Sequence, residues 1–193
     1  MTTFSPRIYS IPYDVFTSPA ASILLPIALG TAVGYSSRPK QTQETYAAMK
    51  QPPLRPPPQV FGPVWTLLYG LMGYAAHRAV TAASTSLVAP AITPDKLRLL
   101  YSAQLGLNLT WMPLFFSLRK PVFALANIIS LVGMNGYLTY LYFGVDEVAG
   151  WCMVPYLAWL GFATYLTAGV GYVNDWDISE STLATRKALG KDL

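Results

Sequence analysis

Five long windows of this sequence carry no formal charge, and their spacing constrains the fold more than any other feature. The windows hold 23 residues after Asp14, 22 after Arg55, 20 after Arg98, 25 after Lys120 and 27 after Glu147. A helix needs about 20 predominantly apolar residues to cross the roughly 30 Å hydrocarbon core of a bilayer. The windows therefore predict an all-α membrane protein, a five-transmembrane-helix bundle.

Two other architectures fit the composition poorly. Apolar residues make up 53% of the chain and charged residues 11%, against roughly 25% charged in soluble domains. A soluble bundle needs a polar stripe along each helix, yet segments such as 128–132 and 156–160 are apolar nearly all round. The windows are also much longer than the strands of about 10 residues that build membrane barrels.

The windows set the expected boundaries. Residues 1–16 are expected to be an N-terminal tail, 17–174 the five-helix domain and 175–193 a polar C-terminal tail. The expected spans are about 17–36, 60–80, 95–117, 121–143 and 148–173.

The basic residues predict an orientation. With five spans, the N-terminus, second loop and fourth loop hold four Lys and Arg residues, while the first loop, third loop and C-terminal tail hold nine. The positive-inside rule then places the C-terminus in the cytosol. Because these cations border the membrane, the net charge of +4 needs no nucleic-acid partner.

The first loop, residues 37–59, is the longest connection and is rich in proline. Five of the seven residues 52–58 are prolines, which forbid a continuous helix there and favour a stiff, extended path. A linker at the membrane surface and a lid over the bundle both fit this composition, because long loops in compact folds are often functional.

The sequence offers little for hydrolytic or metal chemistry. All nine carboxylates lie outside the expected spans or, in the case of Asp95, at the first residue of one, so no buried acid/base pair or proton relay is predicted. His77 is the one histidine and lies at a membrane boundary, which predicts no metal site. Cys152, the one cysteine, is expected to be a small packed residue.

The spans do contain aromatic residues beside a few neutral polar groups. Trp65 and Tyr69 share a helix face at i, i+4, as do Asn108 and Trp111 at i, i+3, and Trp159 lies about 17 Å into the last span. Ordinary helix packing explains any one of these residues. Together they predict a pocket for a flat, largely apolar ligand, because aromatic walls with few polar groups are typical of such sites.

Three segments carry a resemblance to a known family. Residues 61–74 (FGPVWTLLYGLMGY), 104–116 (QLGLNLTWMPLFF) and 155–166 (PYLAWLGFATYL) look like the second-, third- and fifth-helix signatures of the translocator protein (peripheral-type benzodiazepine receptor) family. The three lie in the right order and spacing.

The resemblance implies a five-helix bundle, often dimeric, that binds porphyrins, sterols and synthetic benzodiazepine- or isoquinoline-type ligands in a cavity closed by the first loop. It implies no required cofactor, porphyrin or haem being the ligand, and it implies the mitochondrial outer membrane in a eukaryote or the inner membrane of a bacterium. The loop prolines that match are Pro56 and Pro57. The implied ligand-binding residues are Trp65, Tyr69, Asn108, Trp111, Phe123, Trp159, Ala163 and Leu166.

Three functions follow from this resemblance. The first is a receptor or carrier for tetrapyrroles or other flat lipophiles, with a role in their transport or in stress response. The second is an enzyme that degrades porphyrins with light or an oxidant, through Trp65 and Trp159. The third is a structural or adaptor membrane protein with lipid in its pocket.

The chain also departs from the family pattern at three places. Leu54 stands where the loop usually carries a tryptophan, and Phe123 replaces a fourth-helix tryptophan. The sterol-recognition pattern of animal members needs a basic residue shortly after Tyr172, but the next one is Arg186. High-affinity sterol binding at that position is therefore not expected.

Overall fold

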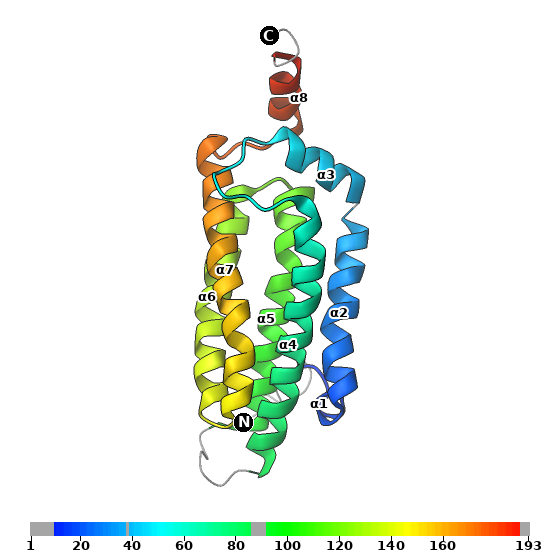
Figure 1. Cartoon of the computed structure of the whole chain (residues 1–193), viewed down its shortest axis with the longest axis vertical. Helices are drawn as coiled ribbons and strands as arrows, with labels where there is room; N and C mark the ends of the chain where they lie inside the picture. The colour runs from blue at the N-terminus through cyan, green and yellow to red at the C-terminus, as the bar shows by residue number, and fades with distance from the viewer. Residues whose placement is uncertain (1–9, 38, 86–91, 190–193) are drawn as a thin grey trace, which may run out of the picture.

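The computed structural model describes residues 10–37, 39–85 and 92–189, and this part of the chain is helical with short connections and no strand. Five long helices run side by side along the longest axis of the molecule (Figure 1): α2 (Pro19–Ser36), α4 (Pro58–Thr85), α5 (Pro94–Met112), α6 (Pro121–Phe143) and α7 (Glu147–Val173). A π-helical segment, η2 (Pro113–Ser117), continues α5. Three short helices lie at the ends of the bundle: α1 (Tyr13–Thr17) at one end, and α3 (Pro39–Ala48) and α8 (Glu180–Leu189) at the other.

Proline and capping residues explain where several helices begin. Proline lies at the start of α2, α5 and α6, where a missing N–H costs no intrahelical hydrogen bond. The Thr93 hydroxyl accepts from the amide of Lys96 at 3.2 Å, and the Asp146 carboxylate accepts from the amide of Ala149 at 2.7 Å. These bonds satisfy amide groups that have no partner inside the helix.

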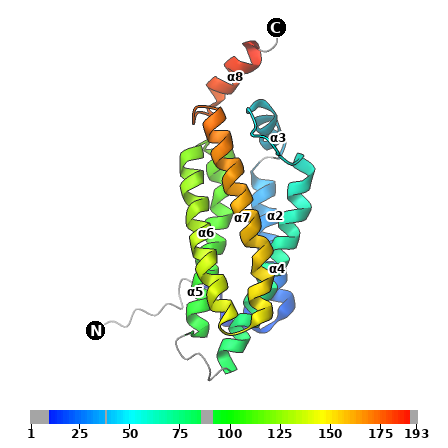
Figure 2. The ribbon, with the colours of Figure 1, turned by 60° about the vertical axis from the view of Figure 1, so that its left-hand side comes forward.

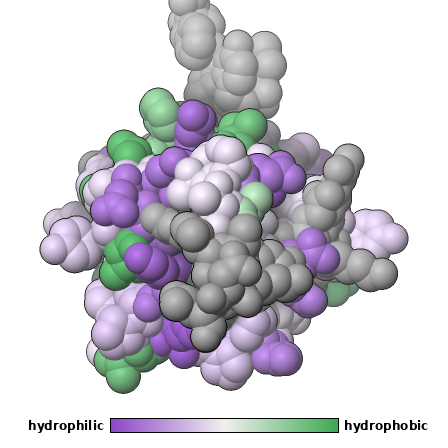
Figure 3. Space-filling model, turned by 90° about the horizontal axis from the view of Figure 1, so that it is seen from above, coloured by the Kyte–Doolittle hydropathy of each residue, from purple (hydrophilic) through white to green (hydrophobic). Residues whose placement is uncertain are grey.

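The interior of the bundle holds polar side chains among its apolar core, and many large apolar side chains lie on the outside. Gln104, Asn135 and Thr167 are buried, whereas Leu67 and Ile129 are exposed. Large apolar side chains on the outside of a helical bundle suit a surface that faces lipid, and polar groups avoid such a surface. Figure 3 shows the end of the bundle near α3 and α8, where hydrophilic residues cover the surface and hydrophobic ones lie at its edge.

Within the described residues, three helices are long and apolar enough to cross a membrane, namely α2, α6 and α7. Helix α5 is not apolar enough over the length of a span, because Asp95, Lys96 and Arg98 lie in its first turns. Helix α4 is also less apolar, because Thr, Tyr and Gly alternate with its apolar residues. The predicted all-helical class is confirmed. The count of five spans stays a prediction.

The structure adds helices in the segments outside the expected spans. Helix α3 occupies the first part of the loop 37–59 and ends at Ala48, before the proline-rich residues, which remain non-helical. Helix α8 lies in the C-terminal tail. Within the N-terminal tail, Phe16 of α1 is buried in the bundle, while residues 1–9 lie outside the described part. Helix α4 begins at Pro58, two residues earlier than expected.

Helix α4 packs on α2, α5 and α7, and α6 packs on α5 and α7 (Figure 2). Helices α2 and α4 approach closely at Gly73, where an added Cβ would overlap the backbone of Ser22. At the end near α1, Arg78 of α4 forms an ion pair of 2.8 Å with Asp146, which precedes α7. The hydrogen bonds from this guanidinium hold the pKa of the Asp146 carboxyl below its usual range.

We predict that Gly73→Ala destabilises the bundle by about 1–3 kcal/mol, the typical cost of overpacking. The added methyl group would overlap backbone atoms of α2, which cannot rotate away as a side chain can. Thermal unfolding of the purified protein in detergent measures this effect. Gly70→Ala, one turn earlier on the same helix, is the matched control, because its nearest neighbour is a side-chain atom 3.9 Å away. Equal melting temperatures for the two variants would contradict the proposed packing.

Candidate ligand-binding site

Four polar side chains form a hydrogen-bonded chain between α4, α5 and α7. The Tyr69 hydroxyl donates to Asn108 Oδ1 at 2.7 Å, and Asn108 Nδ2 donates to the Tyr156 hydroxyl at 2.8 Å. The Tyr156 hydroxyl donates in turn to Gln104 Oε1 at 3.4 Å. Asn108, Tyr156 and Gln104 are buried. Since hydrogen bonds are stronger in surroundings of low polarity, this chain holds the three helices in register.

Trp65 lies against this polar chain. Its ring centroid is 5.4 Å from that of Tyr69 and 6.3 Å from that of Tyr156. Tyr69 itself covers Gly30 of α2, where an added Cβ would overlap the tyrosine ring. The structure therefore brings together three of the predicted site residues, Trp65, Tyr69 and Asn108, between α2, α4, α5 and α7.

A second row of aromatic rings links the first loop to α7. Tyr46 of α3 lies 6.1 Å from Phe61, and Phe61 lies 6.0 Å from Trp159. Trp159 is 5.6 Å from Phe162, which stacks on Tyr165 at 6.2 Å. This row of rings connects α3, at the end of the bundle, with the predicted site residue Trp159.

Two tryptophans keep unused hydrogen-bond donors inside the protein. The indole nitrogens of Trp111 and Trp159 are buried and have no acceptor among the described residues. The Trp111 ring is fixed by stacking on Phe115 at 5.1 Å. Buried N–H groups nearly always find a partner, so each of these two donors can take an acceptor such as water or a ligand.

The remaining predicted ligand-binding residues differ in position. Ala163 is half-buried and packs on the same apolar core as Trp159, and Leu166 is half-buried on α7. Phe123 does not join them, because its side chain is 64% exposed at the start of α6. In that helix Pro121 and Ala124 face the core, which turns Phe123 to the outside.

Residues 49–57, the proline-rich part of the first loop, dock onto the end of α7. Asn174 forms two hydrogen bonds with Lys50, accepting from its amide at 3.1 Å and donating to its carbonyl at 2.8 Å. Pro52 covers Gly169 so closely that an added Cβ would contact the proline ring at 2.7 Å. The Tyr165 hydroxyl donates to the carbonyl of Pro53 at 2.9 Å.

Of the two predicted lid prolines, only Pro56 forms a hydrogen bond with another part of the first loop among the described residues. The carbonyl of Pro56 accepts from the Tyr46 hydroxyl at 3.1 Å, and Pro57 is exposed. Burial raises the pKa of the Tyr46 hydroxyl, with Arg55 acting in the opposite direction, so the donor stays protonated at neutral pH. The loop is thus tied both to itself and to α7.

The sequence-based prediction missed the residues that complete the site. Tyr156 precedes Trp159 by three positions and shares its helix face, a spacing that could have identified it. Gln104 lies four positions before Asn108 and offered the same signal. Asn174 and Gly169 carried no such signal, because their partners lie more than a hundred residues away in the first loop.

Metal and thiol chemistry find little support in the described part of the chain. It contains no group of three or more His, Cys, Asp or Glu side chains that could hold a metal ion. His77 Nδ1 lies 2.6 Å from the carbonyl oxygen of Phe16, which ties α4 to α1. Cys152 is half-buried. Partial burial disfavours the thiolate, which is the reactive form of a cysteine.

Comparison with known proteins covers the whole bundle from α2 to α7. The model of the TspO/MBR family matches residues 22–173. A translocator protein homolog of Schizosaccharomyces pombe is 40% identical over 166 residues, which are 84% of this chain and 98% of the relative. The human translocator protein is 34% identical over 148 residues (77% and 85%), and the tryptophan-rich protein TspO of Archaeoglobus fulgidus is 33% identical over 154 residues (80% and 95%).

We predict that Tyr156→Phe destabilises the protein by about 1–3 kcal/mol, because it leaves polar groups of Asn108 and Gln104 buried without this partner. Chemical or thermal unfolding in detergent measures the change. Tyr142→Phe is the matched control: Tyr142 is also 0% exposed, but its hydroxyl has no partner among the described residues. A loss of stability for Tyr142→Phe as large as that for Tyr156→Phe would contradict a specific role for the polar chain.

Proposed function

This chain belongs to the TspO/MBR family, and on that premise we propose that it is a membrane receptor or carrier whose five long helices all span the bilayer and bind a tetrapyrrole between them. The excess of Lys and Arg, nine against four, supports a cytosolic position for the first loop and the C-terminal end. The bound molecule enters and leaves past residues 49–57, which act as the lid.

The pair of buried indole N–H groups carries this proposal. Trp111 and Trp159 each present a donor inside the bundle with no acceptor in the described part of the chain. A porphyrin offers a large apolar face together with nitrogen and carboxylate acceptors, so it can stack on the tryptophan rings and accept from their N–H groups.

The charges near the lid favour a ligand with acidic groups at one edge. Lys50 and Arg55 lie in or beside the lid, and the Arg55 guanidinium is 5.9 Å from the Tyr46 ring centroid. The propionates of a porphyrin can remain at this charged end while the ring system lies deeper, which avoids burying their charge in the membrane interior.

A tetrapyrrole is a better candidate than a sterol. The outer surface at the end of α7 presents Tyr172, which is 78% exposed, and no basic residue follows it before Arg186. The animal-type sterol pattern is therefore incomplete here, whereas the aromatic interior is intact.

Protoporphyrin binding, measured by isothermal titration calorimetry, tests the site directly. We predict that replacing both Trp65 and Trp159 with Leu weakens binding at least about tenfold, which corresponds to about 1.4 kcal/mol. Trp159→Phe keeps an aromatic ring but removes the N–H group, so it should give an intermediate loss. Calorimetry is preferred because quenching of tryptophan fluorescence would itself change with these substitutions.

Trp151→Leu is the control for that experiment. Trp151 is exposed on the outside of α7, and its indole nitrogen donates to Glu147 at 3.4 Å. Unchanged affinity in the double variant would contradict the proposed site. Illumination of the complex separates binding from catalysis: loss of the Soret band that requires Trp65 or Trp159 would favour porphyrin degradation over carriage.

The docking of the lid generates a second prediction. Asn174→Ala removes both hydrogen bonds to Lys50, so porphyrin release, followed by stopped-flow absorbance, should accelerate about tenfold. Hydrogen exchange at residues 49–57 should rise in the same variant. Asn135→Ala is the control, because Asn135 is another buried asparagine but donates within its own helix, to the carbonyl of Leu131. Faster exchange in the lid without faster release would show that these residues do not gate the site.

A further inference from the structure

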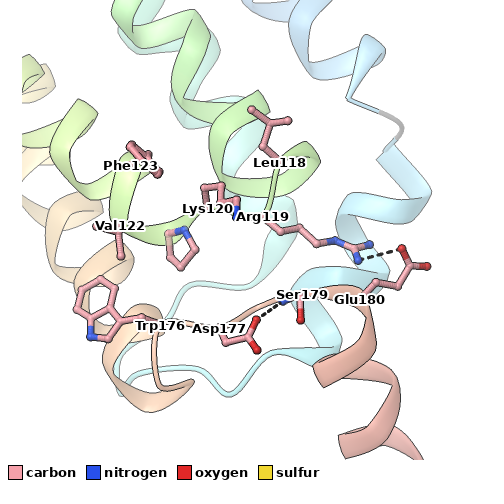
Figure 4. Close-up of a pocket in the computed structure, with 10 residues that line it drawn as sticks. Leu118, Arg119, Lys120, Val122, Phe123, Trp176, Asp177, Ser179 and Glu180 are labelled. Carbon is pink, nitrogen blue, oxygen red and sulfur yellow. Dashed lines mark hydrogen bonds and ion pairs between the residues drawn. The ribbon is translucent and has the colours of Figure 1, made fainter.

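A separate cavity lies at the end of the bundle that carries the lid and α8. It has a volume of about 440 Å³ and is formed by the turn before α6, the first residues of α6 and the segment between α7 and α8 (Figure 4). This volume falls within the range of small-molecule sites. The cavity shares no residue with the polar chain or the two unpartnered tryptophans described above, although it includes Phe123.

One wall of the cavity is apolar and faces outward. Val122 and Phe123 are 54% and 64% exposed, respectively. Both belong to α6, one of the helices that are long and apolar enough to cross a membrane, so their exposed surface is suited to contact with lipid chains. Figure 4 shows Trp176 of the α7–α8 segment on the opposite side, facing Val122.

The polar wall carries charges of both signs. Arg119 and Lys120 supply two cations, and Asp177 and Glu180 supply two carboxylates. Arg119 pairs with Glu180 at 3.1 Å, but the Glu180 side chain remains 88% exposed. The Asp177 carboxylate already accepts from the amide of Ser179 and from the Thr182 hydroxyl. Lys120 has no ion pair within the described residues.

The backbone around the cavity is held in an unfavourable conformation. Four non-glycine residues in the described part have a positive φ, and three of them, Arg119, Asp175 and Trp176, line or adjoin the cavity. Such residues cost conformational energy and persist only where the surroundings hold them. The Trp176 ring packs directly on Gly171, where an added Cβ would overlap the indole.

We propose that this cavity binds the zwitterionic head group of a glycerophospholipid, of the phosphocholine or phosphoethanolamine class. The phosphate binds beside Lys120 and Arg119, and the ammonium group binds beside Glu180. The Trp176 ring, which lies at the other end of the cavity and faces Val122, packs against the start of the acyl chains. The acyl chains then follow the exposed surface of Val122 and Phe123 into the bilayer.

The charge pattern distinguishes this ligand from its competitors. An anionic head group has no cation to place beside Glu180 and would be repelled by it. Free phosphate has no group that uses the apolar wall of Val122 and Phe123. A zwitterionic lipid matches the cations, the carboxylate, the tryptophan and the apolar wall at the same time.

Native mass spectrometry of the purified full chain, released from detergent micelles with added lipid, tests the proposal. We expect one copy of phosphatidylcholine or phosphatidylethanolamine to bind at least about fivefold more tightly than phosphatidylglycerol. Lys120→Gln and Trp176→Leu should each weaken the zwitterionic lipid about fivefold or more. Glu180→Gln should weaken it as well while leaving phosphatidylglycerol unchanged or tighter, which a loss of folding could not produce.

Matched controls come from the opposite end of the bundle. Lys96→Gln removes a cation that lies 5.5 Å from the Tyr137 ring centroid, and Trp151→Leu removes another exposed tryptophan. Neither should change lipid affinity. Tighter binding of phosphatidylglycerol, or equal losses in the Lys96 and Lys120 variants, would overturn the proposal. Displacement of the lipid by millimolar inorganic phosphate would instead assign the site to free phosphate.

Discussion

The hydrogen bonds of Asn108 connect the parts of this bundle that form its interior. Asn108 accepts from Tyr69 of α4 and donates to Tyr156 of α7, so one side chain of α5 joins three helices. Asn108 and Tyr156 are buried, so each of their polar groups left unpaired would cost free energy. Trp65 contacts both tyrosine rings, so its orientation follows from the same bonds. The aromatic wall of the proposed binding site therefore depends on a small polar group at its centre.

Local patterns predicted much of this structure, because charge spacing and helical periodicity act over one or a few turns. The window 121–143 is helix α6, and Trp65, Tyr69 and Asn108 lie together between the helices. The resemblance to the translocator protein family is confirmed over residues 22–173. The spacing of Tyr156 to Trp159 could have identified Tyr156, but its hydrogen-bond partners could not be predicted, because they depend on the rotation of α7 relative to α5. Phe123 was carried over from the family pattern, but the rotation of α6 turns it outward.

The short helices α3 and α8 could not be read from the same patterns. Both are polar, and isolated helices of 10 residues are marginal in water, so their stability comes from tertiary contacts. Met49 after α3, Ile178 before α8 and Leu183 within it share a small apolar cluster with Phe115. These contacts bring the first loop and the C-terminal segment together over the end of the bundle. Leu54, by contrast, is 86% exposed, so the lid docks without the tryptophan that the family pattern has there.

The lid and the proposed lipid cavity meet at the last turn of α7. Asn174 holds Lys50 of the lid, and two residues later Trp176 lines the cavity while its amide donates to the carbonyl of Gly171 at 2.8 Å. A backbone change in this turn would therefore alter both contacts. A ligand shifts an equilibrium only by the difference in its affinity for the two states. A lipid in the cavity would thus favour the closed lid only if the cavity binds it more tightly while Asn174 is bonded to Lys50. A lipid with equal affinity for both lid states would leave the equilibrium between the open and the closed lid unchanged.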